Sequence, residues 1–175
     1  MVRPNSYTYD DLIAAGEGKL FGPEGPQLPL PPMLMFDRIT HIAGDGGLHG
    51  HGHVIAELDI HPGLWFYRCH FQDDPVMPGC LGVDALWQLV GFFLGWRDGK
   101  GKGRALGAGD VKFTGQVRPT IQVVRYDISI RRSKISGASI AFADGLVFAD
   151  ERLVYDCRGL RVGLFSKAAL QAMEQ

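Results

Sequence analysis

Apolar and polar residues alternate strictly in the second half of the chain. From residue 124 to residue 131, every even position is apolar and every odd position is charged or carries a hydroxyl group. A period of two predicts a β-strand with one buried side and one solvent-facing side. Further strands are predicted at Ala138–Ala149 and Leu153–Phe165, joined by a polar turn at Asp150 and Glu151, and Ser166 is expected to cap a terminal helix.

The most apolar run of the chain, Leu81–Trp96, predicts a helix instead. Pro78 precedes it as a helix start signal, and we expect the helix to span residues 79–97. It contains Asp84 and Gln88, and the run is too short and too polar to cross a bilayer. A helix that is apolar on nearly all sides must be enclosed, and an antiparallel sheet curved around it is the natural solution. The expected fold class is therefore α+β.

Residues 1–34 predict a short helix followed by an arm. The helix covers Tyr9–Ala15, where Thr8 and Asp11 have the spacing of a capping box. Five of the ten prolines then lie between Pro23 and Pro32. Such a backbone offers few donors to a sheet, so this segment is either an arm laid over the surface or a flexible linker. The apolar residues that follow directly favour the anchored arm.

Two more strands are predicted before the apolar helix, at Met35–Ala43 and His53–Ile60, around a glycine-rich turn at residues 44–47. The sequence contains no internal repeat and no low-complexity segment. We therefore expect residues 1–175 to form a single domain.

Composition and charge exclude several classes of protein. A net charge of −1 gives no overall attraction to nucleic acid or to an anionic membrane. The three cysteines are odd in number and lack metal-type spacing, which indicates a reducing compartment. Residues 1–20 carry acidic groups where a signal peptide would be apolar. We expect a cytoplasmic protein.

The first candidate for chemistry is Asp84, in the second turn of the apolar helix. A carboxyl group in apolar surroundings loses hydration, which favours its protonated form, and a protonated acid can give a proton to a leaving hydroxyl group. Gln88, four residues later on the same helix face, is within reach to orient it. The alternative is a buried aspartate that is satisfied by a backbone amide.

The second candidate is His70, just before the Pro/Gly turn that leads into this helix. Imidazole is the side chain whose ordinary titration range suits proton abstraction near neutral pH. A lone histidine is often only structural, and the residues by themselves leave both interpretations of His70 open.

The start of the helix supplies a third element. The amides around Gly79 and Cys80 are unpaired donors at the positive end of the helix dipole, suited to a carbonyl oxygen that gains negative charge. Gly79 would also let a substrate approach the backbone closely. A base, an acid and an oxyanion site together would remove a proton next to a carbonyl group and expel a β-hydroxyl group.

Gly91 and Gly95 continue the helix face that carries Asp84 and Gln88. Each glycine costs about 1 kcal/mol of helix propensity relative to alanine. Two interpretations stay open: the stripe borders a slot for an acyl chain, or the glycines allow close backbone packing.

Residues 70–89 read His-Phe-Gln-Asp-Asp-Pro-Val-Met-Pro-Gly-Cys-Leu-Gly-Val-Asp-Ala-Leu-Trp-Gln-Leu. This segment resembles the bacterial 3-hydroxydecanoyl-[acyl carrier protein] dehydratase/isomerase family of type II fatty acid synthesis. The likeness extends to Gly25–Leu28, Gly107–Gln116 and Val162–Phe165, and so it reaches over nearly the whole chain.

The resemblance implies a hot-dog fold, in which an antiparallel sheet wraps around a central helix, and a homodimer with two active sites at its interface. Each site would take His70 from one subunit and Asp84 from the other. His70 would remove the C2 proton, Asp84 would assist the departure of water, and the Gly79 amide would bind the thioester carbonyl. The remaining substrate-binding positions would be Val76, Cys80 and Gln88. Neither a cofactor nor a metal ion is implied.

In that family the trans-2-enoyl product is then isomerised to the cis-3 isomer. Relatives that only dehydrate usually carry glutamate at the position of Asp84, so the aspartate favours the bifunctional branch. The substrate would arrive on acyl carrier protein, an acidic partner. A basic cluster of Arg131, Arg132 and Lys134 is a candidate docking site, and a solvated strand end is the other interpretation of this cluster.

The histidine-rich run His49-Gly-His-Gly-His53 departs from the family pattern. In an extended strand, His49, His51 and His53 would share one face and could bind a metal ion. We favour a solvated hairpin arm.

Three other functions stay open. A hot-dog thioesterase would bind the same thioester but activate water against its carbonyl group. Cys80, at a helix start, could act as a nucleophile with assistance from His70. A protein that only carries acyl chains would need neither an acid nor a base.

Overall fold

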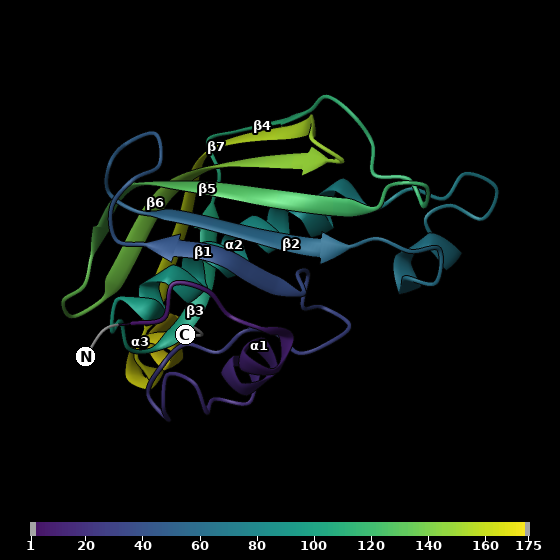
Figure 1. Ribbon diagram of the computed structural model, residues 1–175. Coiled ribbons are helices and arrows are strands. Elements are labelled where there is room, and N and C mark those ends of the chain that lie inside the picture. The colour runs from purple at the N-terminus through teal and green to yellow at the C-terminus, as the bar shows by residue number, and fades with distance from the viewer. Residues whose placement is uncertain (1–2, 174–175) are drawn as a thin grey trace.

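The computed structural model describes residues 3–173, which form one seven-stranded sheet around a long helix (Figure 1). The elements in chain order are α1 (Tyr9–Gly16), β1 (Arg38–Ala43), β2 (His53–Asp59), the 3₁₀ helix η1 (Trp65–Arg68), α2 (Gly79–Trp96), β3 (Lys102–Gly107), β4 (Asp110–Phe113), β5 (Val123–Lys134), β6 (Ser139–Ala149), β7 (Arg152–Phe165) and α3 (Lys167–Met173).

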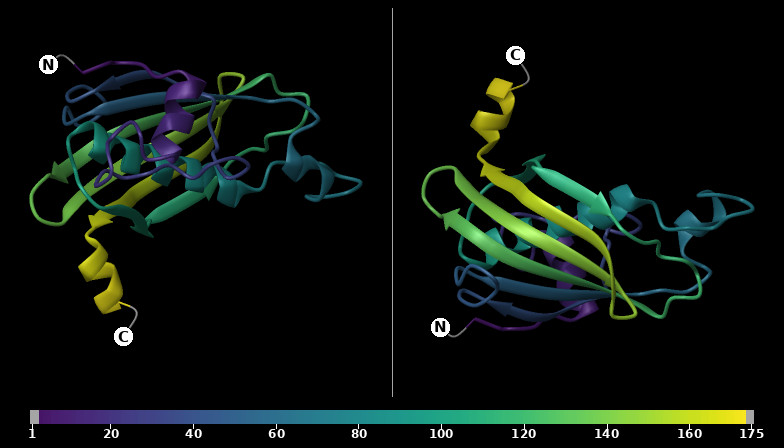
Figure 2. Two further views of the ribbon diagram at one scale, coloured as in Figure 1. Left: turned by 90° about the horizontal axis from the view of Figure 1, so that it is seen from below. Right: turned by 90° about the horizontal axis from the view of Figure 1, so that it is seen from above.

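The sheet order is β1-β2-β5-β6-β7-β3, and β4 also pairs with β7. All of these pairs are antiparallel. The sheet curves over α2, while α1 and the N-terminal arm lie on the side of α2 that faces away from the sheet (Figures 1 and 2). This arrangement is the hot-dog fold that the resemblance implied. β1 forms one edge of the sheet, and β3 and β4, which both pair with β7, form the other.

The core lies between α2 and the inner face of the sheet. The even positions of β5 from Val124 to Ile130 are fully buried, which confirms the strand predicted from alternation. With 18 residues and a mean hydropathy of 1.3, α2 has the length and composition of a membrane span, because Gly79 and Cys80 extend the apolar run. Of its residues, 67% are nevertheless buried inside the protein, so burial identifies it as a core helix.

The N-terminal helix and arm are anchored, as predicted. Thr8 and Asp11 form both halves of the capping box at the start of α1. Residues 17–37 form no helix or strand, yet Leu28 is only 6% exposed and belongs to the core. The arm is therefore a fixed layer over α2.

Three strands differ from the prediction. β1 begins at Arg38 rather than at Met35, because the Met35 amide donates to the side chain of Gln88 instead of to a strand. β3 and β4 were not predicted at all. Both are at least partly exposed at every residue, so neither shows the alternation that marks a half-buried strand.

The end of the chain follows the prediction. Asp150 and Glu151 form the turn between β6 and β7 with positive φ angles of 44° and 66°. The Ser166 hydroxyl oxygen accepts a hydrogen bond from the Ala169 amide at 3.2 Å and caps α3, which projects away from the sheet (Figure 2).

Candidate active site

His70 lies on the connection between β2 and α2, residues 60–78. Hydrogen bonds to the backbone of Val117 hold this connection in place. The Tyr67 hydroxyl group and the Met77 amide both donate to the carbonyl oxygen of Val117, at 3.2 and 2.9 Å. Burial raises the pKa of Tyr67 to about 12, so its hydroxyl group keeps the proton that it donates. The segment that carries His70 therefore has a defined path.

The imidazole of His70 is held by one ring nitrogen. Its Nδ1 lies 2.9 Å from the carbonyl oxygen of Val76. A carbonyl group can only accept a hydrogen bond, so in the neutral ring Nδ1 carries the proton and Nε2 keeps a free lone pair. The His70 amide donates to the Phe66 carbonyl, and the His70 carbonyl accepts from the Val76 amide. The backbone thus sets the tautomer that a general base requires.

His70 lines a pocket of about 500 Å³ at the start of α2, which we call the histidine pocket. Other residues in its wall are Val76, Gly79, Cys80, Trp87, Phe113 and Tyr155. Four of the positions that the sequence assigned to the site therefore meet in one pocket.

Gly79 has a packing role that the sequence did not indicate. A Cβ atom at Gly79 would lie 2.7 Å from the Phe113 ring, so this contact also favours glycine, and the close approach of a substrate stays a prediction. Pro78 caps α2 without a side-chain hydrogen bond in the described chain. Because the first amides of a helix have no acceptor within it, those of Gly79 and Cys80 suit a carbonyl oxygen.

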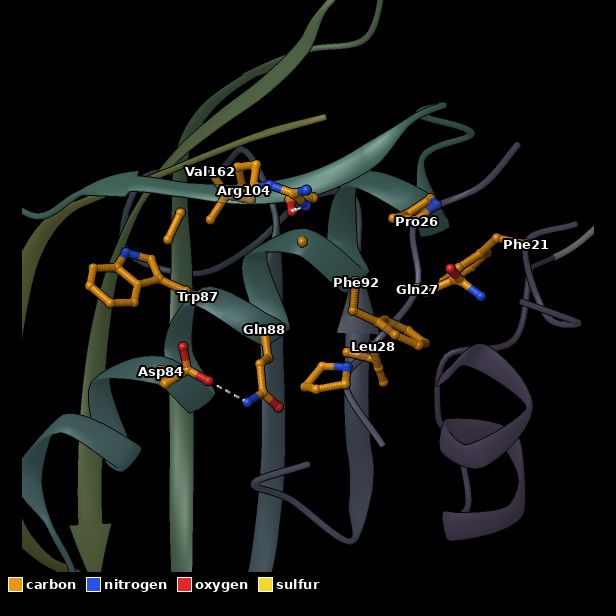
Figure 3. Close-up of a pocket in the computed structure, with 14 residues that line it drawn as sticks. Phe21, Pro26, Gln27, Leu28, Asp84, Trp87, Gln88, Phe92, Arg104 and Val162 are labelled. Carbon is orange, nitrogen blue, oxygen red and sulfur yellow. Dashed lines mark hydrogen bonds between the residues drawn. The ribbon is translucent and has the colours of Figure 1, made fainter. Parts of the chain in front are cut away.

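Asp84 is linked to the N-terminal arm through Gln88 (Figure 3). The Gln88 Nε2 atom donates to Asp84 Oδ2 at 2.6 Å and to the Met33 carbonyl oxygen at 2.8 Å, and Gln88 Oε1 accepts from the Met35 amide at 3.2 Å. The two backbone groups fix which end of the amide faces Asp84. Asp84 is only half-buried in the single chain, less than the sequence suggested, because it borders a pocket. Its protonation stays a prediction.

Asp84 and Gln88 line a second pocket of about 260 Å³, which we call the aspartate pocket. Its walls come from α2, the N-terminal arm, β3 and Val162 of β7 (Figure 3). In the single chain His70 does not line this pocket and Asp84 does not line the histidine pocket, whereas Trp87 lines both. One chain therefore keeps the two groups in separate pockets, and their meeting across a subunit interface stays a prediction.

The two stripe glycines of α2 have different surroundings. Among the described residues, a Cβ atom at Gly91 would meet only Val162, at 3.8 Å, and Gly91 lines the aspartate pocket. A Cβ atom at Gly95 would lie 2.6 Å from Pro26 Cγ and 2.9 Å from the Phe21 ring. Gly91 thus borders open space, as in the slot interpretation, whereas Gly95 permits close packing of the arm.

This contrast predicts opposite effects of alanine on stability. Gly91→Ala is expected to raise the free energy of unfolding by up to about 1 kcal/mol, because alanine favours the helix and its methyl group fits. Gly95→Ala is expected to lower it by about 1–3 kcal/mol, because the rigid Pro26 ring cannot rotate away. Urea unfolding of the two matched variants measures both effects. Equal effects would contradict the assignment of Gly95 to arm packing.

Phe113 and Tyr155 were not singled out from the sequence. Their rings meet edge to face at 4.9 Å in the wall of the histidine pocket. Burial, with smaller effects from Cys157 and Cys80, raises the pKa of Tyr155 to about 12, so its hydroxyl group is neutral at physiological pH. Phe113 lies in a segment that carried the resemblance, which was the available signal. Other residues of the aspartate pocket that the sequence did not single out lie on the arm, such as Phe21, and on the unpredicted β3, such as Arg104.

In the basic cluster at the end of β5, one of the three charges is already paired with a carboxylate and is less available to a partner than predicted. The Nε atom of Arg131 lies 2.8 Å from both carboxylate oxygens of Asp144, which is buried on β6. The Arg132 guanidinium group lies 4.0 Å from the centre of the Phe142 ring and, like Lys134, is exposed. Because the charge of Arg131 is already paired, Arg132 and Lys134 are the better candidates for carrier docking.

The histidine-rich run packs on the outer face of the sheet. β2 begins only at His53, so the run is not one extended strand. His49 lies 2.8 Å from Asp144 and His53 lies 2.8 Å from Asp127, whereas His51 is exposed. Within residues 3–173 no group of three or more His, Cys, Asp or Glu side chains is arranged to hold a metal ion. The pairing of His49 and His53 with separate carboxylates corrects the metal hypothesis. The segment is the mostly exposed hairpin between β1 and β2, as favoured, but of the three imidazoles only that of His51 is free in solvent.

Asp144 predicts a loss of stability in acid. Burial alone would raise the pKa of Asp144, but hydrogen bonds from Arg131, the Gly159 amide and His49 outweigh it and lower the pKa below its ordinary value of 3.8. A depressed folded-state pKa gives stabilisation that is complete well above the unfolded-state pKa and is lost as the pH falls through the folded-state value.

Asp144→Asn is therefore expected to lower the free energy of unfolding at neutral pH by about 1–3 kcal/mol. It should also make the free energy of unfolding less dependent on pH in the acid range. Urea unfolding of both proteins from neutral pH to below pH 3.8 measures the two effects. A variant with wild-type stability at neutral pH and an unchanged acid slope would refute this role of Asp144.

Solved structures share this fold. A protein described as the dehydratase heterocomplex ApeI:P from Xenorhabdus doucetiae matches 83% of this chain and 92% of its own length, with a TM-score of 0.67 and 15% identity. An uncharacterized protein from Pyrococcus horikoshii matches 77% of this chain and 85% of its own, with a TM-score of 0.53 and 12% identity. A hypothetical thioesterase with coenzyme A from Streptococcus pneumoniae matches 73% and 84%, with a TM-score of 0.50 and 9% identity. At these identities the likeness establishes the fold alone.

A comparison with family models assigns the chain to a sequence family as well as to a fold. The model of the FabA-like domain matches residues 28–158, more than half of the 175 residues. His70, Asp84 and Gln88 lie inside the matched range. The chain belongs to the FabA-like domain family.

Proposed function

We propose that the protein dehydrates 3-hydroxydecanoyl chains on acyl carrier protein and isomerises the trans-2-enoyl product to the cis-3 isomer, in cytoplasmic synthesis of unsaturated fatty acids. Membership of the FabA-like family supports a hot-dog dehydratase or thioesterase. The observation that carries the choice of a dehydratase is the hydrogen bond from His70 Nδ1 to the Val76 carbonyl group. It leaves Nε2 as a base beside the first amides of α2.

The proposed reaction begins when His70 Nε2 takes a proton from C2 of the substrate. The electron pair moves onto the thioester oxygen, which the amides of Gly79 and Cys80 stabilise. The pair then forms the C2–C3 double bond while the C3–O bond breaks, and Asp84 protonates the departing hydroxyl group to give water. Isomerisation needs the same kinds of group, since one proton leaves C4 and another is added at C2.

A complete site requires two copies of the chain in this proposal. The separate pockets of His70 and Asp84 support this requirement, as does the position of Trp87 in the wall of both. β3 borders the aspartate pocket and is an exposed edge strand, which is suited to pairing with a second copy.

The purified protein should accordingly have twice the 19.2 kDa mass of the chain. The Xenorhabdus relative is described as a heterocomplex, so a monomeric chain that becomes active only with a second protein would point to that arrangement instead.

Carrier docking predicts an effect limited to carrier-bound substrate. Charge reversal at both Arg132 and Lys134 is expected to raise KM for the acyl carrier protein substrate about tenfold or more, while KM for a short pantetheine thioester stays unchanged. Reversal at Lys19 and Lys167, which are exposed on other parts of the chain, is the matched control. If both substrates were affected equally, this surface would not be the docking site.

The test of the function is incubation with 3-hydroxydecanoyl thioester, followed by chromatographic separation of the products. Formation of both enoyl isomers supports the whole proposal, and formation of the trans-2 isomer alone leaves a dehydratase without isomerase activity. Release of free thiol without dehydration identifies a thioesterase. Binding without any turnover identifies an acyl-chain carrier. Loss of turnover in Cys80→Ala would favour the nucleophile hypothesis for Cys80.

A further inference from the structure

The aspartate pocket has two unlike ends. Asp84 and Gln88 lie at one end, and Phe21 lies at the opposite end, beside Gln27 and Pro26 (Figure 3). Between them the pocket follows α2 past Gly91, which has no side chain of its own to narrow it. From Asp84 to Phe92, the last α2 residue in the pocket wall, the helix axis advances about 12 Å at 1.5 Å per residue. The pocket is therefore elongated, with Asp84 and Gln88 at one end and the rings of Phe21 and Pro26, beside the Gln27 side chain, at the other.

Phe21 closes its end of the pocket against the helix. The ring lies where a Cβ atom at Gly95 would be only 2.9 Å away, so it is seated directly on the α2 backbone. It also meets the Phe92 ring edge to face at 5.0 Å. The ring of Phe21 is only half-buried, and it belongs to the wall of the pocket rather than to the interior of the core.

The arm that carries Phe21 is fixed on both sides of the pocket. The Gly101 amide donates to the Glu24 carbonyl oxygen at 2.7 Å, which ties the arm to the start of β3. Lys102 Nζ donates to the Gln27 side chain at 2.7 Å, and Gln27 Nε2 donates to the Gly16 carbonyl oxygen at 3.3 Å. These bonds hold the backbone around Phe21, so the ring forms a firm barrier.

We propose that Phe21 sets the longest acyl chain that the protein accepts. This inference rests on the proposed function. The hydroxyl-bearing carbon is placed at Asp84, and the rest of the chain then extends past Gly91 until its methyl end meets the Phe21 ring. Hydrophobic pockets discriminate by about 10-fold or more per methylene group when there is no room for it. A single side chain on the N-terminal arm is thus the specificity-determining residue.

The test compares 3-hydroxyacyl pantetheine thioesters of six to sixteen carbons in the wild type, Phe21→Ala and Phe21→Trp. In Phe21→Ala, the ratio of kcat/KM for a fourteen-carbon chain to kcat/KM for a ten-carbon chain is expected to rise about tenfold or more. In Phe21→Trp, the preferred chain is expected to become shorter. The ratio is taken within one protein, so a smaller folded fraction does not alter it. Leu30→Ala removes an exposed apolar side chain from the same arm outside the pocket, and it should keep the wild-type ratio.

Binding of saturated acyl pantetheine thioesters, measured by calorimetry, separates this inference from the proposed function. If the wild type binds these saturated chains but does not dehydrate 3-hydroxyacyl thioesters, the proposed function is wrong, and the length dependence of binding in the same variants still tests Phe21. If both Phe21 variants keep the wild-type chain-length preference in turnover and in binding, Phe21 is not the barrier. If the wild type neither dehydrates nor binds acyl thioesters, both proposals are wrong.

Discussion

Replacing His70 with asparagine is expected to lower kcat/KM for dehydration by about 10²–10⁴-fold, the usual contribution of a general base. An asparagine side chain can still offer an N–H donor to the Val76 carbonyl group, which His70 Nδ1 contacts at 2.9 Å. It has no basic nitrogen, so the substitution removes the Nε2 lone pair while it keeps the local hydrogen bond. Steady-state kinetics with 3-hydroxydecanoyl pantetheine thioester measure the loss.

The matched control is His61→Ala, because His61 is an exposed histidine on the same connection between β2 and α2 and lies outside both pockets. This variant should retain nearly full activity. An equal loss in both variants would mean that the connection is generally sensitive to substitution. A His70→Asn variant that is folded and within a few-fold of the wild type would remove the base from the proposed mechanism.

The central helix and the strands that cover it could be predicted because each buries a regular pattern. Val124, Tyr126, Ile128 and Ile130 are buried at alternate positions, and their period is visible without any knowledge of their neighbours. α2 is apolar on nearly every side, which required enclosure by a sheet. Burial patterns of this kind involve residues that are close together in the sequence, so they can be recognised without a structure.

The position of Gln88 shows what local patterns leave out. The i, i+4 spacing on a helix placed Gln88 beside Asp84, and the 2.6 Å hydrogen bond agrees with that expectation. Its other partners, Met33 and Met35, are more than fifty residues away in sequence. Nothing in the spacing of apolar residues encodes a bond between an arm and a helix. The contact of the Phe21 ring with Gly95 is likewise not encoded in local spacing, because it depends on how the arm folds back over α2.

Charged residues were harder to interpret than apolar ones for a similar reason. Arg131 and His49 both looked solvated, since a charge or an imidazole at a strand end usually faces water. In the folded chain both contact Asp144, which comes from a different strand. The sequence showed where the charges are but not which of them are paired, because the pairing depends on strand register. Of the three basic residues proposed for carrier docking, only Arg132 and Lys134 therefore remain candidates.

Asp84 supports the second large prediction, because it would complete a site from the other subunit. Asp84→Asn keeps a side chain that can contact Gln88 but cannot supply a proton as a carboxylic acid does. Its dehydration rate is expected to fall by about 10²–10⁴-fold, like that of His70→Asn. Each variant by itself should therefore be almost inactive in the product assay, whatever the arrangement of the two residues.

A mixture of the two variants distinguishes a shared site from a site within one chain. In a mixed dimer with shared sites, one site receives His70 from the Asp84→Asn chain and Asp84 from the His70→Asn chain, and it is intact. Random exchange of subunits makes half of the dimers mixed, and each has one intact site of two, so activity should return to about a quarter of the wild-type value. If the base and the acid came from the same chain, every site would lack one of them and the mixture would stay inactive. Native mass spectrometry of differently tagged chains confirms that exchange has occurred, so that an inactive mixture of true mixed dimers would refute the shared site.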